Sequence, residues 1–222
     1  MQPYQFWQDF LPASAPAANP PYADAYPAIL PDGRTLLLPL RALPDGRTAL
    51  CSLIINQASF PVLDALAGHL ADRLREHDPE VVVGLPTLGL TLASAVAVRL
   101  GHTRYVPLGT SRKFWYDQRL SVPLSSITTP DEKRLYLDPR LLPLLEGKRV
   151  VLIDDVISTG RSITAGLELL AIAGIEPVAI GTAMLQSERW RDNPGLAGRE
   201  RQVVTVIRSP RLTRDPGGWG AE

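Results

Sequence analysis

The sequence has little cysteine, no excess of charge and no long apolar run. Its 222 residues include one cysteine, Cys51, which excludes an internal disulfide framework and a zinc site built on thiolates. A lone cysteine is typical of a small buried side chain in a reducing compartment, so we expect a cytoplasmic protein. The 23 basic and 23 acidic residues cancel, which leaves no basic field for nucleic acid.

Signals for export and for membrane insertion are also missing. Residues 1–21 lack a basic start followed by an apolar stretch, and no run of about 18 apolar residues occurs. The composition, with 45% hydrophobic and 21% charged residues, is that of an ordinary globular protein. We therefore expect one main domain with a small appended lobe, and no membrane or nucleic-acid partner.

Proline is abundant, with 21 residues, and it is concentrated near the start of the chain. Because proline disfavours long helices and central strands, we expect an irregular arm over residues 1–25. The sequence Leu-Pro-Asp-Gly-Arg-Thr then occurs twice, at 30–35 and 43–48, and Pro-Asp-Gly favours tight turns. Two such turns between short apolar runs predict an antiparallel β-meander over residues 26–56.

Residues 57–185 have the pattern of an α/β core. Apolar residues at helical spacing predict helices, and short β-branched or aliphatic runs between them predict strands. The expected helices are 60–77, 92–100 and 162–173, and the expected strands are 81–85, 105–108, 149–153 and 177–185. This alternation predicts a parallel sheet with helices on both faces.

Two further regions have weaker patterns. Residues 111–139 show no sustained periodicity, and a loop of that length is usually functional or mobile. Residues 186–222 form a C-terminal tail, in which 202–207 predicts a strand at the sheet edge or in the small lobe.

Residues 150–162 carry the chemistry. Four aliphatic residues precede the acids Asp154 and Asp155, and two apolar residues then lead into a polar loop. Ligands of open α/β sheets bind beyond the carboxyl ends of strands, so both acids are expected at the site edge. The loop offers hydroxyls and backbone N–H groups at a helix start, which suit a phosphate, while the carboxylates suit a polyol or hydrated Mg²⁺. The loop residues are Ser158, Thr159, Gly160, Arg161 and Ser162.

Each half of this motif has a purely structural alternative. Adjacent acids can cap a helix beside a solvated neighbour, and Ser/Thr/Gly loops open many helices. The two halves in this order favour a phosphate in the loop and a ribose at the acids. The loop lacks the Gly-Lys pair of a Walker A motif, and no Gly-x-Gly-x-x-Gly follows an early strand, which disfavours triphosphatases and dinucleotide-binding proteins.

The motif at 150–162 resembles the 5-phosphoribosyl diphosphate (PRPP) motif of type I phosphoribosyltransferases, in the style of the adenine, xanthine and orotate enzymes. The resemblance covers about residues 60–185 and implies an α/β core with a small hood lobe. It implies that Asp154 and Asp155 hold the ribose hydroxyls and, through these or through water, Mg²⁺, while the loop binds the 5′-phosphate. The implied reaction transfers the 5-phosphoribosyl group of PRPP to a nucleobase nitrogen and releases diphosphate. Homodimers are common in the family, so we expect one here.

Two other segments fit the same resemblance. The residues Pro86, Thr87, Leu88 and Gly89 resemble the loop that binds diphosphate, although adenine-specific relatives carry arginine where Leu88 stands. Arg112 and Lys113 resemble the basic pair that begins the mobile loop, and they are expected to neutralise diphosphate on closure. The structural alternatives are an ordinary strand-to-helix turn and a solvated basic pair. The following aromatics, at 114–116, would either cover the site or pack on the body.

The acceptor base is expected to be selected by the hood, for which 26–56 and the tail 186–222 are the candidates. Trp190 either stacks on the base or anchors the tail. A purine is the first choice, because both loops look closer to the adenine and xanthine group. The alternative function is a PRPP-sensing regulator, but no helix-turn-helix or basic face accompanies the motif. A phosphoacceptor receiver domain would place its acids after the first strand of a much shorter chain.

Overall fold

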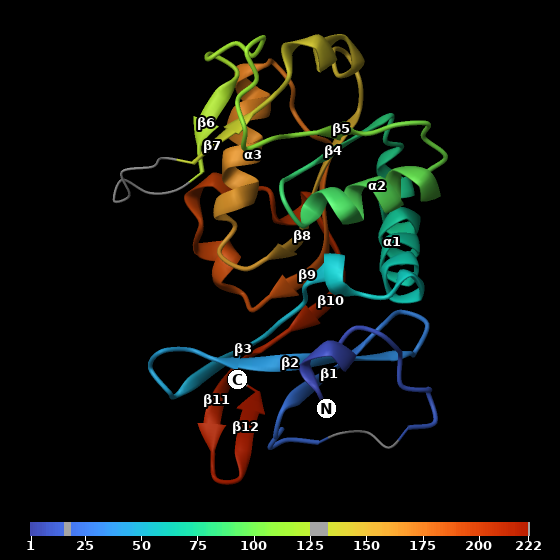
Figure 1. Ribbon diagram of the computed structural model, residues 1–222, viewed down its shortest axis with the longest axis vertical. Coiled ribbons are helices and arrows are strands. Elements are labelled where there is room, and N and C mark those ends of the chain that lie inside the picture. The colour runs from blue at the N-terminus through green and yellow to red at the C-terminus, as the bar shows by residue number, and fades with distance from the viewer. Residues whose placement is uncertain (16–18, 125–132, 222) are drawn as a thin grey trace.

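Two five-stranded sheets organise the chain in the computed structural model, which describes residues 1–15, 19–124 and 133–221 (Figure 1). Residues 16–18 of the expected arm, 125–132 of the expected loop and residue 222 lie outside the described residues. One sheet is parallel and lies with the three α-helices, and the other is antiparallel and contains strands from both ends of the chain.

The parallel sheet has the strand order β10-β9-β8-β4-β5. Its strands are β4 (Val81–Gly84), β5 (Val106–Pro107), β8 (Val150–Ile157), β9 (Ala179–Gln186) and β10 (Val203–Ser209). Helices α1 (Phe60–Leu74) and α2 (Gly89–Arg99) lie on one side of it and α3 (Arg161–Ile172) on the other (Figure 1). Alternate residues of β8 confirm this arrangement, because Val151 packs in the α1–α2 core and Leu152 in the α3 core. The predicted α/β fold with helices on both faces is therefore confirmed.

Two predicted boundaries of the core were wrong. Strand β8 continues through both acids to Ile157, instead of ending at residue 153, because β9 supplies a partner as far as Leu185. The parallel sheet also extends past residue 185, since β10 pairs with β9 along its whole length. Two positions were expected for a strand at residues 202–207, the sheet edge or the small lobe, and the strand lies at the sheet edge.

The antiparallel sheet has the order β1-β2-β3-β11-β12. Its strands are β1 (Ala25–Ile29), β2 (Thr35–Ala42), β3 (Thr48–Cys51), β11 (Arg211–Asp215) and β12 (Gly218–Ala221). The two Pro-Asp-Gly turns join the first three strands, with φ of 84° at Gly33 and 64° at Gly46, where only glycine is unstrained. The meander thus forms where the sequence placed it, but the C-terminal strands complete its sheet.

The N-terminal arm is irregular, with one 3₁₀ turn at Pro3–Gln5, but it is packed against the body. Phe6 and Trp7 are buried, and the Trp7 Nε1–H donates to the carbonyl of Ser52 at 3.1 Å. Tyr22 bridges to Trp219 of β12. Burial of these aromatics, rather than secondary structure, holds the arm in place.

The predicted loop 111–139 contains a pair of strands that sequence periodicity did not reveal. Strands β6 (Ser121–Pro123) and β7 (Arg134–Tyr136) pair antiparallel. Leu120 and Leu135 on this hairpin pack in the same hydrophobic core as Ile163 of α3. Three residues per strand are too few to display an alternating pattern, which explains the omission.

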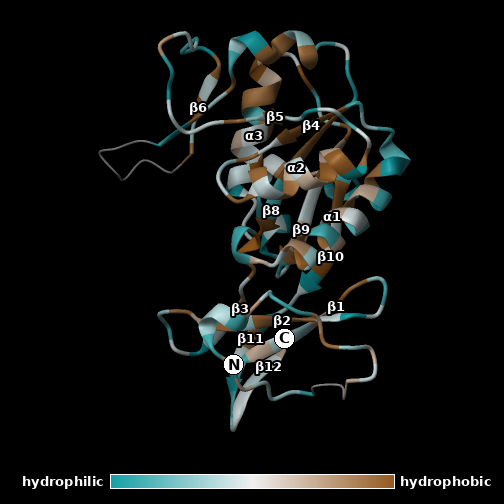
Figure 2. Ribbon diagram, turned by 45° about the vertical axis from the view of Figure 1, so that its right-hand side comes forward, coloured by the Kyte–Doolittle hydropathy of each residue, from teal (hydrophilic) through white to brown (hydrophobic). Residues whose placement is uncertain are grey.

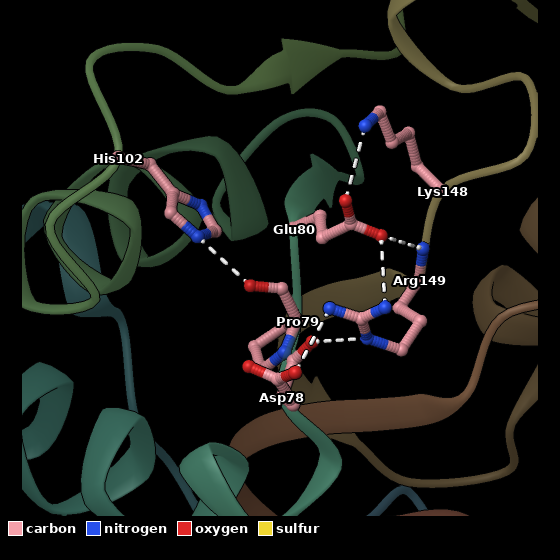
Figure 3. Close-up of polar contacts among 6 residues, drawn as sticks. All are labelled: Asp78, Pro79, Glu80, His102, Lys148 and Arg149. Atoms are coloured by element: carbon pink, nitrogen blue, oxygen red, sulfur yellow. Dashed lines mark hydrogen bonds and ion pairs between the residues drawn. The ribbon is translucent and has the colours of Figure 1, made fainter.

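The amino ends of β4 and β8 are joined by a polar network (Figure 3). Glu80 accepts from Lys148 Nζ at 3.0 Å and from the backbone N–H of Arg149 at 3.1 Å, which lowers the pKa of Glu80. The Arg149 guanidinium also reaches Asp78, at 2.9 Å, and His102 contacts the carbonyl of Pro79 at 3.0 Å. Such exposed pairs contribute little stability individually, so we assign this network to strand register.

Hydropathy follows the same architecture. The most apolar segments are the central parallel strands and the helix faces turned to them (Figure 2). Within the described ranges, no helix combines the length and the apolar character that a bilayer crossing needs.

Candidate active site

The carboxyl ends of the parallel strands face the antiparallel sheet. Strand β10 ends at Ser209 and the chain enters β11 at Arg211, so the carboxyl end of β10 meets the antiparallel sheet. Strands β4, β8 and β9 run parallel to it and end at the same edge. Gln186 at the end of β9 donates its Nε2–H to the carbonyl of Cys51 in β3 at 2.6 Å. Any ligand of this edge therefore lies between the two sheets.

Asp154 and Asp155 lie in β8, just beyond the last residue paired with β4. Their exposed fractions are 7% and 8%, and the Asp155 N–H donates to Asp154 Oδ1 at 3.0 Å. Burial raises the pKa of both carboxyls, and the Asp155 charge raises that of Asp154 further. No basic side chain is bonded to either acid among the described residues. The pair is therefore ready to accept hydroxyl donors or a cation.

The segment Pro86–Gly89 packs against Asp154. It follows β4, and Gly89 begins α2. A Cβ on Gly89 would lie 2.8 Å from Asp154 Oδ1 and 2.9 Å from its Cα, so only glycine fits. The Pro86–Thr87 peptide bond is cis, and Thr87 is exposed. The sequence-predicted diphosphate loop thus lies directly beside the acids.

Residues Ser158–Ser162 form a small hollow where β8 meets α3. Gly160 has a φ of 77° and Arg161 is the first residue of α3, so the backbone turns at Gly160 and presents N–H groups at the helix start. The hollow has a volume of about 100 Å³, and Asp154 lines it together with residues 156–163. Hydroxyls, free N–H groups and the positive end of α3 make it an anion cradle.

Comparison with known proteins identifies this arrangement. The family model described as "Phosphoribosyl transferase domain" matches residues 55–210. The chain belongs to the phosphoribosyltransferase family. The matched region contains the acids, the hollow and the Pro86–Gly89 segment, so the resemblance of the motif is confirmed.

Individual relatives in this family differ in their named acceptors. The chain is 32% identical over 112 residues to an adenine phosphoribosyltransferase of Novosphingobium aromaticivorans, covering 50% of this chain and 60% of that protein. It is 32% identical over 140 residues to an orotate phosphoribosyltransferase of Halorhodospira halophila, covering 62% and 58%. It is 29% identical over 158 residues to an adenine phosphoribosyltransferase of Streptomyces avermitilis, covering 70% and 82%. The matches therefore span about 60% of the first two relatives.

Solved phosphoribosyltransferases share the fold. The structure of an adenine enzyme from Giardia lamblia matches with a TM-score of 0.59 at 23% identity, covering 77% of this chain and 93% of that one. One from Thermoanaerobacter pseudethanolicus matches with a TM-score of 0.55 at 21% identity, covering 67% and 81%. These structural matches show the shared fold, a parallel sheet with flanking helices.

The basic pair expected over the diphosphate lies away from this phosphoribosyltransferase site. Arg112 and Lys113 are exposed, and neither side chain makes a hydrogen bond or ion pair with another residue that the structure describes. The segment between β5 and β6 is at the end of the molecule opposite the antiparallel sheet (Figure 1). The structure therefore does not bring the pair to the acids.

The aromatic residues after the pair are divided between the body and the solvent. Trp115 donates its Nε1–H to Asp138 at 3.1 Å and carries Arg140 over its ring at 4.1 Å, whereas Phe114 is 95% exposed. Trp115 thus packs on the body with an exposed fraction of 37%, and the Phe114 ring contacts Trp115 edge-on, with the ring centroids 4.7 Å apart.

Trp190 is buried with an exposed fraction of 1%, inside the α3 core. A ring in that position is not presented to a base. The structure therefore corrects the base-stacking prediction, and the anchoring alternative explains Trp190, because its ring holds the tail segment against α3.

Sequence reasoning missed two polar residues that contact the phosphate loop. Arg189 Nη2 donates to Ser158 Oγ at 2.8 Å, and Asn193 Nδ2 donates to the carbonyl of Thr159 at 2.8 Å. Both follow β9. Arg189 is the first residue of the 3₁₀ segment Arg189–Asp192, and Asn193 lies between this segment and the 3₁₀ segment Pro194–Leu196. The strand-end rule that identified the acids also applies to β9, and it would have drawn attention to these residues.

A larger cleft adjoins this segment, with a volume of about 650 Å³. It lies where Tyr26 of the antiparallel sheet faces the end of β10 and the residues after β9. Its charged lining residues are Arg189, Arg191, Arg208, Arg211, Glu188 and Asp192. Its place between the sheets and its size suit a ring-containing ligand.

Proposed function

We propose that the chain transfers the 5-phosphoribosyl group of PRPP to a ring nitrogen of a nucleobase, with a purine as acceptor, and releases diphosphate. The observation that carries the proposal is the contact of Gly89 with Asp154 beside the hollow of Ser158–Ser162. This arrangement supports the proposal, because Pro86–Gly89, the two acids and Ser158–Ser162 follow one another along one edge in the order in which PRPP carries its diphosphate, ribose hydroxyls and 5′-phosphate. Under this proposal the partners are PRPP and a nucleobase, and the assembly is a homodimer.

The cradle and the acids bind and orient PRPP in the proposed mechanism. Backbone N–H groups and hydroxyls of the loop donate to the 5′-phosphate, and Asp154 and Asp155 accept from the ribose hydroxyls. Attack by the base nitrogen on C1 breaks the bond to the diphosphate oxygen, which leaves with the electron pair. The chain needs no nucleophile of its own, so its task is orientation and stabilisation of the departing charge.

Mg²⁺ fits this site through the acids. Mg²⁺ is usually held by one or two carboxylates together with substrate phosphates, and the two buried acids without a basic partner offer that donor set. Among the described residues no group of three or more acidic, histidine or cysteine side chains forms a metal site. The remaining oxygen ligands of the ion would therefore come from PRPP. When bound, the ion supplies charge neutralisation to the diphosphate.

The basic pair has a role only after movement of its segment. We propose that Lys113 and Arg112 neutralise diphosphate oxygens in a closed state and that the segment from Thr87 to Gly89 binds the same group before closure. The exposure of the pair and its lack of contacts in the described part of the chain leave both side chains available for this role.

The test is an assay of diphosphate release from PRPP with Mg²⁺, run against adenine, guanine, hypoxanthine, xanthine, orotate and uracil. We expect release with a purine, and Asp155→Asn should weaken PRPP binding in calorimetry. Release with orotate alone would overturn the choice of acceptor. Absence of PRPP binding by the wild-type protein would overturn the function itself.

A PRPP-sensing regulator is the second candidate, favoured by the place of the segment between β5 and β6 at the end of the molecule opposite the antiparallel sheet (Figure 1). A regulator needs the binding site without the closing loop. Tight PRPP binding together with no release for any of the six bases would identify this function.

A further inference from the structure

Arg189 places a positive charge at the rim of the phosphate hollow. Its Nη2 donates to Ser158 Oγ at 2.8 Å, and its Nε lies 3.4 Å from Ser187 Oγ. Ser158 is one of the residues that line the hollow. The guanidinium is therefore one hydroxyl group away from any anion that occupies it.

Arg189 has no carboxylate partner in the described part of the chain, and the same holds for Arg211 in the adjoining cleft. Arg191 and Arg208 line the same cleft, and both pair with Glu188, at 2.5 and 3.4 Å. Arg189 is half-buried and bonds only to the two serine hydroxyls, which carry no charge. Holding a half-buried guanidinium against neutral groups is costly unless an anion compensates it.

The residues that line the hollow include one cation, Arg161, and one acid, Asp154. Its lining also offers hydroxyls and N–H groups, and Asp155 lies next to Asp154 in β8. Arg161 in the loop has an exposed side chain at the start of α3. A phosphomonoester dianion in the hollow would therefore meet Arg161 in the loop and Arg189 beside Ser158, and a guanidinium can make a forked contact with phosphate.

We propose that Arg189 is a binding residue for the 5′-phosphoryl group of the substrate, contacting it directly beside Ser158. This inference rests on the proposed function, since it takes a 5-phosphoribosyl compound as the ligand. Asn193 supports the site by fixing the loop: its Nδ2 bonds the carbonyl of Thr159, and its Oδ1 accepts from the Gly195 N–H at 2.9 Å. The tail after β9 thus completes the phosphate site that the motif of β8 begins.

The experiment is calorimetry on the full chain with two probes, ribose 5-phosphate and inorganic diphosphate with Mg²⁺. Arg189→Gln keeps a donor for Ser158 but removes the charge, and Arg189→Lys restores the charge. Arg201→Gln is the matched control, because Arg201 is exposed and is not among the cleft residues. We expect Arg189→Gln to weaken ribose 5-phosphate binding at least tenfold, which is about the size of one charge-assisted contact. Diphosphate binding should stay within about twofold of wild type, because the lost contact is made to the 5′-phosphoryl group.

The outcomes separate the two proposals. Partial recovery in Arg189→Lys with no effect in Arg201→Gln supports the charge contact, since a merely structural role would be preserved in Arg189→Gln. Wild-type affinity for ribose 5-phosphate in Arg189→Gln overturns the inference, and so does an equal loss for both probes. If Arg189→Gln fails to fold, the Arg189→Lys variant decides. Wild-type binding of ribose 5-phosphate by Arg189→Lys supports the contact, and loss of binding of both probes overturns it. Failure of the wild-type protein to bind either ribose 5-phosphate or PRPP overturns the proposed function instead.

Discussion

Replacement of Asp154 by asparagine should stabilise the folded protein while it weakens PRPP binding. Asp154 is buried, its Oδ1 accepts from the Asp155 N–H, and the Asp155 carboxyl is next to it. Both burial and the neighbouring charge raise the pKa of Asp154. In the absence of a ligand, the charged form is therefore an unfavourable feature of the folded state.

The sign and the size follow from proton linkage. Because the folded-state pKa is above the unfolded one, the folded protein loses stability as pH rises from about 4 through the folded pKa. Each unit of difference is worth about 1.4 kcal/mol. The neutral amide retains an oxygen that accepts from the Asp155 N–H. We therefore expect Asp154→Asn to raise the free energy of unfolding by about 2 kcal/mol at pH 8, which is within the range that an unsatisfied buried polar group costs. For a chain of this size that corresponds to an increase in Tm of about 4–8 °C.

Thermal unfolding of both proteins at pH 5 and pH 8 measures this effect, and calorimetry with PRPP and Mg²⁺ measures the loss of binding. The difference in Tm should be larger at pH 8 than at pH 5. Asp72→Asn is the control, since the Asp72 side chain is 73% exposed and should change the free energy of unfolding by less than about 0.5 kcal/mol. A variant that is less stable than wild type at pH 8, or a difference that does not depend on pH, would refute the idea that the pair is electrostatically strained without ligand.

Three other changes test the site and its surroundings. Gly89→Ala should lower both stability and turnover, because its Cβ would lie 2.8 Å from an oxygen of Asp154. The control Gly68→Ala in α1 meets nothing within 4 Å, so its free energy of unfolding in denaturant should rise by about 0.5–1 kcal/mol. Asp138→Asn should cost about 1 kcal/mol in urea unfolding at pH 7, with the loss shrinking as pH falls, because the Arg140 guanidinium lowers the pKa of Asp138 to about 2; an unchanged difference at pH 3 would contradict this. Lys113→Ala should reduce turnover about a hundredfold with an unchanged Tm, and normal turnover in the folded variant would reject its role.

Several features could be predicted from local sequence because they depend on neighbouring residues alone. The alternation of apolar strands and amphipathic helices predicted the parallel sheet and its two helical layers. The Pro-Asp-Gly turns predicted the meander, since glycine with positive φ is a local requirement. The acids and the Ser158–Ser162 loop could be assigned to one site because a strand that enters a helix must present both at the same edge.

Tertiary structure decided the features that depend on distant partners. The length of β8 depends on β9, and the burial of Trp190 depends on α3, neither of which is visible in the local pattern. The sequence by itself determined the fold class and the residues that could bind a phosphorylated sugar, because periodicity and strand-end chemistry are local properties. Only the folded chain decided that Arg189 and Asn193 contact the Ser158–Ser162 loop, and that Lys113 stands apart from it, because such contacts depend on how segments far apart in sequence meet in space.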